Sequence, residues 1–75
     1  MLRFIKQVIL NDVDNVVYQL NEEKSAFGEW SVVTDISHYR DEDGEHEIRV
    51  KFANNLEVFI PYHSVLYIVE EPFKE

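Results

Sequence analysis

The side chains of this chain that could do chemistry are three histidines and fifteen acidic residues, and they are densest in the segment SHYRDEDGEHEIRV. His38 and His46 flank the acidic part of that segment. In a hairpin the two imidazoles could face each other and bind a zinc-like ion, with oxygen ligands from Asp41, Asp43 or Glu45. A histidine pair on a solvated face requires no metal, and we favour this simpler interpretation.

The same segment does not have the pattern of a calcium-binding loop. Such a loop needs a glycine at its sixth position and a bidentate glutamate at its twelfth. Counted from Asp41, the glycine is Gly44, at the fourth position, and the twelfth residue is Phe52. We therefore predict no metal site.

No arrangement of residues indicates catalysis. Ser37-His38 and His63-Ser64 combine a nucleophile with a base, but adjacent side chains of an extended chain point to opposite sides. Cysteine is absent, which excludes thiolate nucleophiles and disulfides and suits a reducing cytoplasm. With only two glycines, the chain also lacks a glycine-rich phosphate loop. We predict a cytoplasmic protein that is not an enzyme and uses no cofactor.

The acidic segment is the strongest candidate for a functional surface. Residues 35–47 contain six acidic side chains and only one basic side chain, Arg40. On a strand Glu45 and Glu47 would lie on one face about 6.6 Å apart, and the opposed strand could add Asp35. DNA presents one negative charge per about 1.7 Å of axis, so a stiff row of carboxylates on this scale could occupy a groove built for phosphates.

The predicted partner-binding residues are all acidic. Glu70 and Glu71 would extend the row if the last strand neighbours the hairpin, or if a second copy of the chain adds its own hairpin. The alternative is a solvated hairpin tip without a binding role. The full predicted set is Asp35, Asp41, Glu42, Asp43, Glu45, Glu47, Glu70 and Glu71.

The overall charge restricts the classes of partner. Fifteen acids against seven bases give a net charge of −8, and residues 25–75 hold eleven of those acids and only four of the bases. Such a field repels nucleic acid and anionic lipid and attracts basic proteins over about 8 Å at physiological salt. We therefore expect a basic protein partner, no direct binding to nucleic acid and no membrane association.

The chain length allows one domain, residues 1–75, with a marginal core. A homodimer is therefore a plausible means of extra stability. The longest apolar-leaning run, Phe4–Leu10, is far shorter than the roughly 20 residues of a membrane span. The start, Met1-Leu2-Arg3, also lacks the apolar stretch of a signal peptide.

Residues 1–24 have a helical spacing. Their apolar side chains recur at steps of three and four residues, which is typical of one helical face. Asn11-Asp12 is also a good N-cap, so residues 2–9 could instead form a separate strand. On both interpretations we expect residues 11–23 to be helical. The apolar positions are Leu2, Ile5, Ile9, Val13, Val16, Val17 and Leu20.

After residue 24 the period changes to two, which predicts strands. Residues 30–39 and 46–52 alternate around the acidic turn and indicate a hairpin. Asn54-Asn55 predicts a tight two-residue turn to a third strand, residues 56–60, which Pro61 would end. Residues 65–69 are almost entirely apolar and predict a fourth strand that is buried on both faces.

These elements predict an α+β fold, in which an N-terminal helical element packs on an antiparallel meander of about four strands. The stretch Val58–Ile68, a strand, a tight turn and a strand, resembles the last two strands of SH3-like and Sm-like barrels. That resemblance implies, as an alternative, a small barrel with a helix. The basic rim with which Sm-like proteins hold RNA has no counterpart here.

The combination of small size, no cysteine, strong acidity and a β-hairpin scaffold resembles the phage-encoded DNA-mimic proteins that block host DNA-binding proteins. The resemblance implies a non-enzymatic inhibitor. Its target would be a basic protein of the host cytoplasm, such as an HU-type nucleoid protein, RNA polymerase or a nuclease.

A second hypothesis places the function on aromatic side chains. In Ala26-Phe27-Gly28-Glu29-Trp30 we expect a link into the sheet with Trp30 filling the core. The alternative is a contact with a partner or with a second copy. The protein would then be a small barrel-like interaction module or assembly subunit, recognised through Phe27, Trp30, Phe59 and Tyr62.

Overall fold

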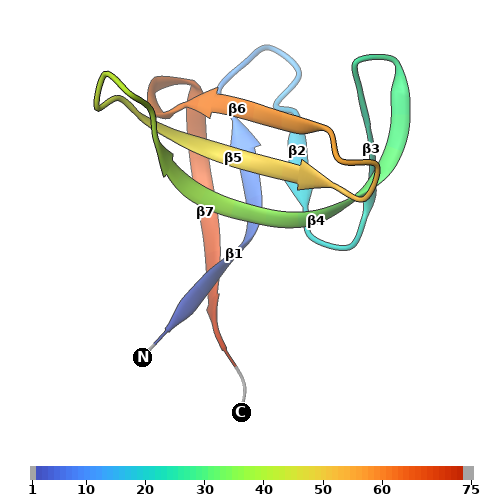
Figure 1. Ribbon diagram of the computed structural model, residues 1–75, viewed down its shortest axis with the longest axis horizontal. Coiled ribbons are helices and arrows are strands. Elements are labelled where there is room, and N and C mark those ends of the chain that lie inside the picture. The colour runs from blue at the N-terminus through green and yellow to red at the C-terminus, as the bar shows by residue number, and fades with distance from the viewer. Residues whose placement is uncertain (1, 74–75) are drawn as a thin grey trace.

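The structure, a computed structural model, describes residues 2–73 and consists of strands joined by short loops (Figure 1). A single 3₁₀ turn, η1, precedes the last strand in this part of the chain. The elements are β1 (Arg3–Leu10), β2 (Val17–Gln19), β3 (Glu23–Ala26), β4 (Glu29–Arg40), β5 (His46–Phe52), β6 (Glu57–Pro61), η1 (Tyr62–Ser64) and β7 (Val65–Pro72).

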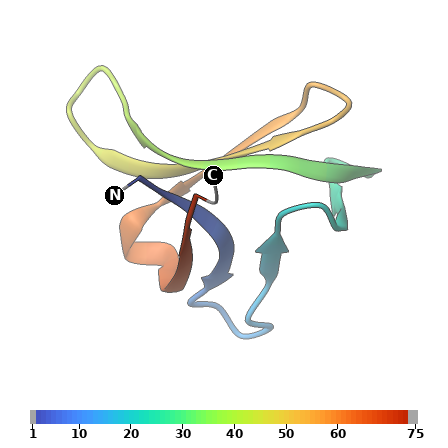
Figure 2. The ribbon, with the colours of Figure 1, turned by 90° about the horizontal axis from the view of Figure 1, so that it is seen from below.

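The strands form two antiparallel sheets that pack face to face. One sheet has the order β2-β1-β7 and the other the order β3-β4-β5-β6. The two layers are visible in Figure 2, and in Figure 1 the strands of one sheet cross those of the other. β4 is the longest strand, and it pairs with β3 through its first half and with β5 through its second.

The predicted N-terminal helix is wrong, and with it the α+β class. Residues 3–10 form β1, as the strand alternative proposed, but residues 11–23 are not helical either. Within residues 2–73 the protein has no α-helix and so none long and apolar enough to cross a membrane. The helix is therefore also wrong in the alternative of a small barrel with a helix.

A β-bulge interrupts the strand alternation of β1. The register with β7 shifts between Ile5 and Gln7, so that Lys6 is an extra residue in the strand. A bulge reverses the inward and outward alternation. Ile5 and Val8 consequently both face the core, at 2% and 0% exposure, although they are three residues apart. This spacing is the one that a helix would also give.

Asp12 stabilises a loop and not a helix. The Val16 N–H donates to Asp12 Oδ1 at 3.2 Å, and the Asn15 N–H donates to the Asp12 carbonyl at 3.3 Å. Asn15 has φ 48°, a left-handed conformation that ends any helical turn. Val13 is fully exposed, as expected for a loop.

Of the predicted four-stranded meander, β4, β5 and β6 pair in order, but the fourth strand, β7, pairs with β1 in the other sheet. Two details of these strands also differ from the prediction. The loop between β5 and β6 has three residues and not two, because the Phe52 N–H donates to Leu56 O and Asn55 adopts φ 71°. The last strand is not buried on both faces, since Leu66 is 56% and Tyr67 59% exposed. Pro61 ends β6 as predicted.

The core lies between the two sheets. Val8 of β1 and Val33, Ile48 and Val50 of the second sheet have no exposed surface. Burial of such side chains is the main source of stability in a domain of this size. The whole cluster is Ile5, Val8, Tyr18, Ala26, Val33, Ile36, Ile48, Val50, Phe52 and Ile60.

A second bulge, in β4, corrects the prediction that Trp30 fills the core. Val33 pairs with Phe52 but Asp35 pairs with the preceding residue Lys51, so Thr34 is the extra residue. Ile36 and Val33 both face the core as a result. Trp30 lies on the opposite, outer face of the sheet and is 71% exposed.

Candidate functional site

The loop between β4 and β5 is held in one conformation by Asp41. Asp41 Oδ1 accepts hydrogen bonds from the N–H groups of Asp43 and Glu45, both at 2.9 Å. The Asp41 N–H donates to Glu45 O at 3.0 Å, and the Gly44 N–H donates to Asp41 O at 3.0 Å. Gly44 supplies the positive φ, 84°, that closes the turn. Asp41 therefore orders the loop, and its carboxylate is occupied by the backbone.

The remaining acids of the segment project from this ordered loop. Glu42 and Asp43 are exposed at its tip, Glu45 is the last residue of the loop, and Glu47 follows two residues later in β5. Among residues 2–73 the only close contacts between an acidic and a basic side chain join Lys6 to Glu71 and His38, which is charged only when protonated, to Glu70. Glu42, Asp43, Glu45 and Glu47, which we call the acidic tip, therefore have no basic partner in the described part of the chain.

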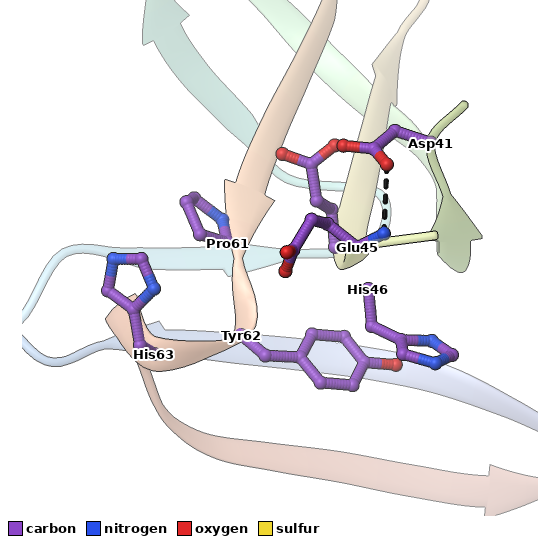
Figure 3. A pocket seen from close by; sticks show the side chains of 7 residues that line it. Asp41, Glu45, His46, Pro61, Tyr62 and His63 are labelled. Atoms are coloured by element: carbon purple, nitrogen blue, oxygen red, sulfur yellow. Dashed lines mark hydrogen bonds between the residues drawn. The ribbon is translucent and has the colours of Figure 1, made fainter. Parts of the chain in front are cut away.

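An open pocket of about 540 Å³ lies beside the acidic tip (Figure 3). The loop between β4 and β5 and the start of β5 supply one side of its lining, and the end of β6 with η1 supplies the other. Three carboxylates, two imidazoles and a phenol suit a cationic group, which the carboxylates would neutralise and the aromatic rings would contact. The lining residues are Asp41, Glu45, His46, Glu47, Pro61, Tyr62 and His63.

The predicted carboxylate row does not continue along the sheet. Asp35 is opposite Lys51, which in turn is opposite Glu57. Along the outer face of β5 the side chains are Glu47, Arg49 and Lys51, so the charge changes from negative to positive between the first and the second of these positions. Asp35 consequently lies at the basic end of the face and does not join the acidic tip.

Glu70 and Glu71 are not part of the acidic tip. Both belong to β7, in the other sheet. Glu71 Oε1 is 3.0 Å from Lys6 Nζ, and Glu70 Oε2 is 3.9 Å from His38 Nε2. Each has a basic neighbour within the chain, which reduces its use for an external cation.

The two histidines of the hairpin contact a tyrosine and not each other. His46 is opposite Arg40 in the ladder, whereas His38 is opposite Ile48. His38 Nδ1 is hydrogen-bonded to the Tyr62 hydroxyl, and the His46 ring stacks on Tyr62 at a centroid distance of 5.5 Å. Within residues 2–73 no three His, Cys, Asp or Glu side chains form a metal-binding group.

Sequence reasoning missed the η1 side of the pocket. Pro61 was interpreted only as a strand end, and His63 only as a neighbour of Ser64. Their place beside the acidic tip follows from the pairing of Pro61 with Glu47. Only that long-range register, and no local pattern, could have indicated it.

An aromatic cluster on the outer face was also missed. The rings of Tyr39 and Phe59 are 5.0 Å apart, and the Arg49 guanidinium lies 5.8 Å from the Tyr39 ring. Arg49 Nε and Ser37 Oγ are buried without a hydrogen-bond partner. The alternating aromatic and charged positions of β4, β5 and β6 were the available signal.

The chain matches no protein-family model, no curated protein and no solved structure. The geometry of the surface itself therefore carries the evidence about function.

Proposed function

We propose that the protein is a non-enzymatic binding protein whose acidic tip occupies a basic, nucleic-acid-binding surface of another protein. The observation that supports this most strongly is the unneutralised charge on an ordered loop. Glu42, Asp43, Glu45 and Glu47 lie on or beside a turn fixed by the carboxylate of Asp41, and none has a basic partner among residues 2–73.

Order matters because it lowers the cost of binding. A floppy acidic loop would lose conformational entropy when held by a partner, whereas this loop has already lost it on folding. Like charges on one turn also repel one another, and a basic partner relieves that repulsion. The acidic tip is therefore better suited to an external cation than acids that are already paired.

The adjoining pocket supports the same partner class. A lysine or arginine of the partner would lie between the carboxylates of Glu45 and Glu47 and the ring of Tyr62. Proteins that bind nucleic acid present such side chains in rows. An HU-type nucleoid protein, RNA polymerase or a nuclease of a bacterial cytoplasm fits this description, and the cytoplasm is the compartment that the proposal requires.

The test is a calorimetric titration with a purified HU-type nucleoid protein. We expect affinity to fall about tenfold or more between 50 and 200 mM salt, because the contacts release counterions. Double-stranded DNA added to the complex should displace the acidic protein. Salt-independent affinity, or a complex that also holds DNA, would contradict the proposal.

A matched pair of variants separates the acidic tip from overall charge. Glu42→Gln with Asp43→Asn and Glu45→Gln removes three charges from the tip. Asp14→Asn with Glu22→Gln and Glu57→Gln removes three exposed charges from elsewhere. We expect the first variant to lose most of its affinity and the second to retain it. Equal losses would show that net charge, and not the tip, attracts the partner.

The interaction-module hypothesis remains as a second candidate because its aromatic residues are exposed. Phe27, Trp30, Phe59 and Tyr62 are between 40% and 75% accessible. Phe59 packs on Tyr39, and Tyr62 packs on His46. Among residues 2–73, neither Phe27 nor Trp30 packs against another aromatic ring.

A further inference from the structure

The turn between β3 and β4 has an unfavourable residue at its most exposed position. Ala26 pairs with Glu29, which leaves Phe27 and Gly28 as a two-residue loop. Their φ angles are 53° and 80°, so both are left-handed, as in a type I′ turn. Asparagine, aspartate and glycine adopt this conformation readily at the first position, whereas a bulky side chain is strained there.

The described residues 2–73 cover only a small part of this side chain. The side chain of Phe27 is 75% exposed, and it lies next to an open glycine whose absent Cβ would meet no atom within 4 Å. An asparagine at this position would fit the turn better and would leave less apolar surface in water. Folding therefore gives no reason for a phenylalanine here.

Trp30 adds to the same exposed surface. The bulge at Thr34 places it on the outer face, where its cross-strand neighbour is the small Ser25. Its ring is accordingly uncovered, at 71% exposure. Phe27 and Trp30, which we call the aromatic tip, are three residues apart on one short hairpin. Figure 1 shows this hairpin at the opposite end of β4 from the loop of residues 41–45.

The charge around the aromatic tip is negative. Glu29 follows the turn directly and Glu23 lies in β3, and both are exposed and have no ion pair among the described residues. The only base of the hairpin, Lys24, lies over the Tyr18 ring, 5.7 Å from its centroid. The complement of such a surface is an apolar segment bordered by lysine or arginine, which can also lie over the Trp30 ring.

A second copy of the chain does not fit this surface. In a dimer formed through this surface, each aromatic tip would lie against the equally acidic hairpin of the second copy. Each copy also carries a net charge of −8, so the two acidic hairpins would repel each other. An anionic membrane is disfavoured for the same electrostatic reason.

We propose that the aromatic tip is a second protein-binding surface, in which Phe27 and Trp30 anchor a basic, apolar segment of a partner protein. The exposed glutamates of the hairpin border the contact. This surface is distinct from the acidic tip, so either proposal can fail alone.

The experiment uses the fluorescence of Trp30, the only tryptophan of the chain. The probe is a ten-residue peptide that alternates arginine and leucine. We expect a saturable blue shift of the emission as Trp30 becomes covered. Two control peptides should bind at least about tenfold more weakly. One alternates arginine with serine and lacks the apolar side chains, and the other alternates glutamine with leucine and lacks the positive charge.

The decisive variant is Phe27→Asn. It should fold at least as stably as the wild type but bind the arginine-leucine peptide about five- to tenfold more weakly, as expected for loss of an aromatic anchor. Trp30→Thr, measured by calorimetry, should weaken binding similarly, whereas Tyr67→Thr on the other sheet should not. Tyr67 is a matched control because it is 59% exposed.

Three results would overturn the inference. The first is unchanged peptide affinity in Phe27→Asn. The second is sedimentation of the wild type as a dimer that Phe27→Asn dissociates, because the occupant would then be a second copy. The third is a Trp30 blue shift with phosphatidylcholine vesicles equal to that with the peptide, because the surface would then bind lipid.

Discussion

The two hairpins that share β4 end in loops of opposite character. In the loop of residues 41–45 each special residue satisfies a requirement of the backbone, since Asp41 accepts two N–H groups and Gly44 supplies a positive φ. In the loop of Phe27 and Gly28 the phenylalanine adopts an unfavourable left-handed conformation and exposes apolar surface. Acidity at a hairpin tip is thus compatible with folding alone, whereas a strained, exposed phenylalanine requires another explanation.

Both hairpins pack on the same core, so the loss of a core side chain should have the largest effect on stability. Ile48 has no exposed surface and lies between the sheets. Ile48→Ala should lower the free energy of unfolding by about 2–5 kcal/mol, through lost burial and the cavity that remains. Leu66→Ala, at a position 56% exposed, should change it by about 0.5 kcal/mol or less.

Hydrogen exchange measures whether the hairpins are coupled. In Ile48→Ala the amides of β3 and of β5 should lose protection together, because β4 connects them. Loss of protection in β5 alone would show that the β3–β4 hairpin folds independently, and the two tips could then not be compared as parts of one unit.

The acidic loop is predicted to be sensitive to the geometry of Asp41 and not to its charge. Asp41→Ala removes the acceptor of two backbone N–H groups and should cost about 1–2 kcal/mol in urea unfolding. Asp41→Asn keeps an acceptor oxygen and should cost much less. If both variants lose the same stability, the carboxylate charge and not the hydrogen bonding orders the loop.

The smallest predicted effect concerns Tyr18, whose ring is contacted by Lys24 of β3. Burial, and to a lesser extent the Asp12 carboxylate, raises the pKa of Tyr18 above its ordinary value of 10.0. The unfolded chain therefore loses this proton at a lower pH than the native protein does. The resulting contribution to stability is complete below pH 10 and is lost as the pH rises toward the native pKa.

Tyr18→Phe is the control for this titration. Urea unfolding at pH 8 and at pH 10.5 should show a larger loss of stability in the wild type than in Tyr18→Phe. An equal loss in both proteins would mean that Tyr18 does not contribute to the alkaline transition.

The sequence allowed β5 and β6 to be predicted because both strands alternate without interruption. Asn54-Asn55 and Pro61 also mark their ends by conformational preferences that act locally. The sequence left β1 open between helix and strand, and it predicted the strand of β4 but placed Trp30 on the wrong face. Each of these strands contains a bulge, at Lys6 and at Thr34. A bulge is set by pairing with a distant strand and reverses the alternation on which the prediction depends.

The features of the candidate sites also differ in whether they depend on the local sequence or on the pairing of distant strands. The density of charge in residues 41–47 is a local property and could be recognised from the sequence. The separation of Asp35, Glu70 and Glu71 from that charge depends on which strands pair, and so does the exposure of Trp30. The strain at Phe27 depends on a two-residue loop, whose length only the register of β3 with β4 establishes.

Urea unfolding of Phe27→Asn tests the contrast between the two tips most directly. The variant replaces a strained, exposed side chain by one that adopts φ near 50° with little cost. We predict that its free energy of unfolding is higher than that of the wild type, by about 1 kcal/mol. A value lower than that of the wild type would show that Phe27 stabilises the fold, and the aromatic tip would then need no partner to explain it.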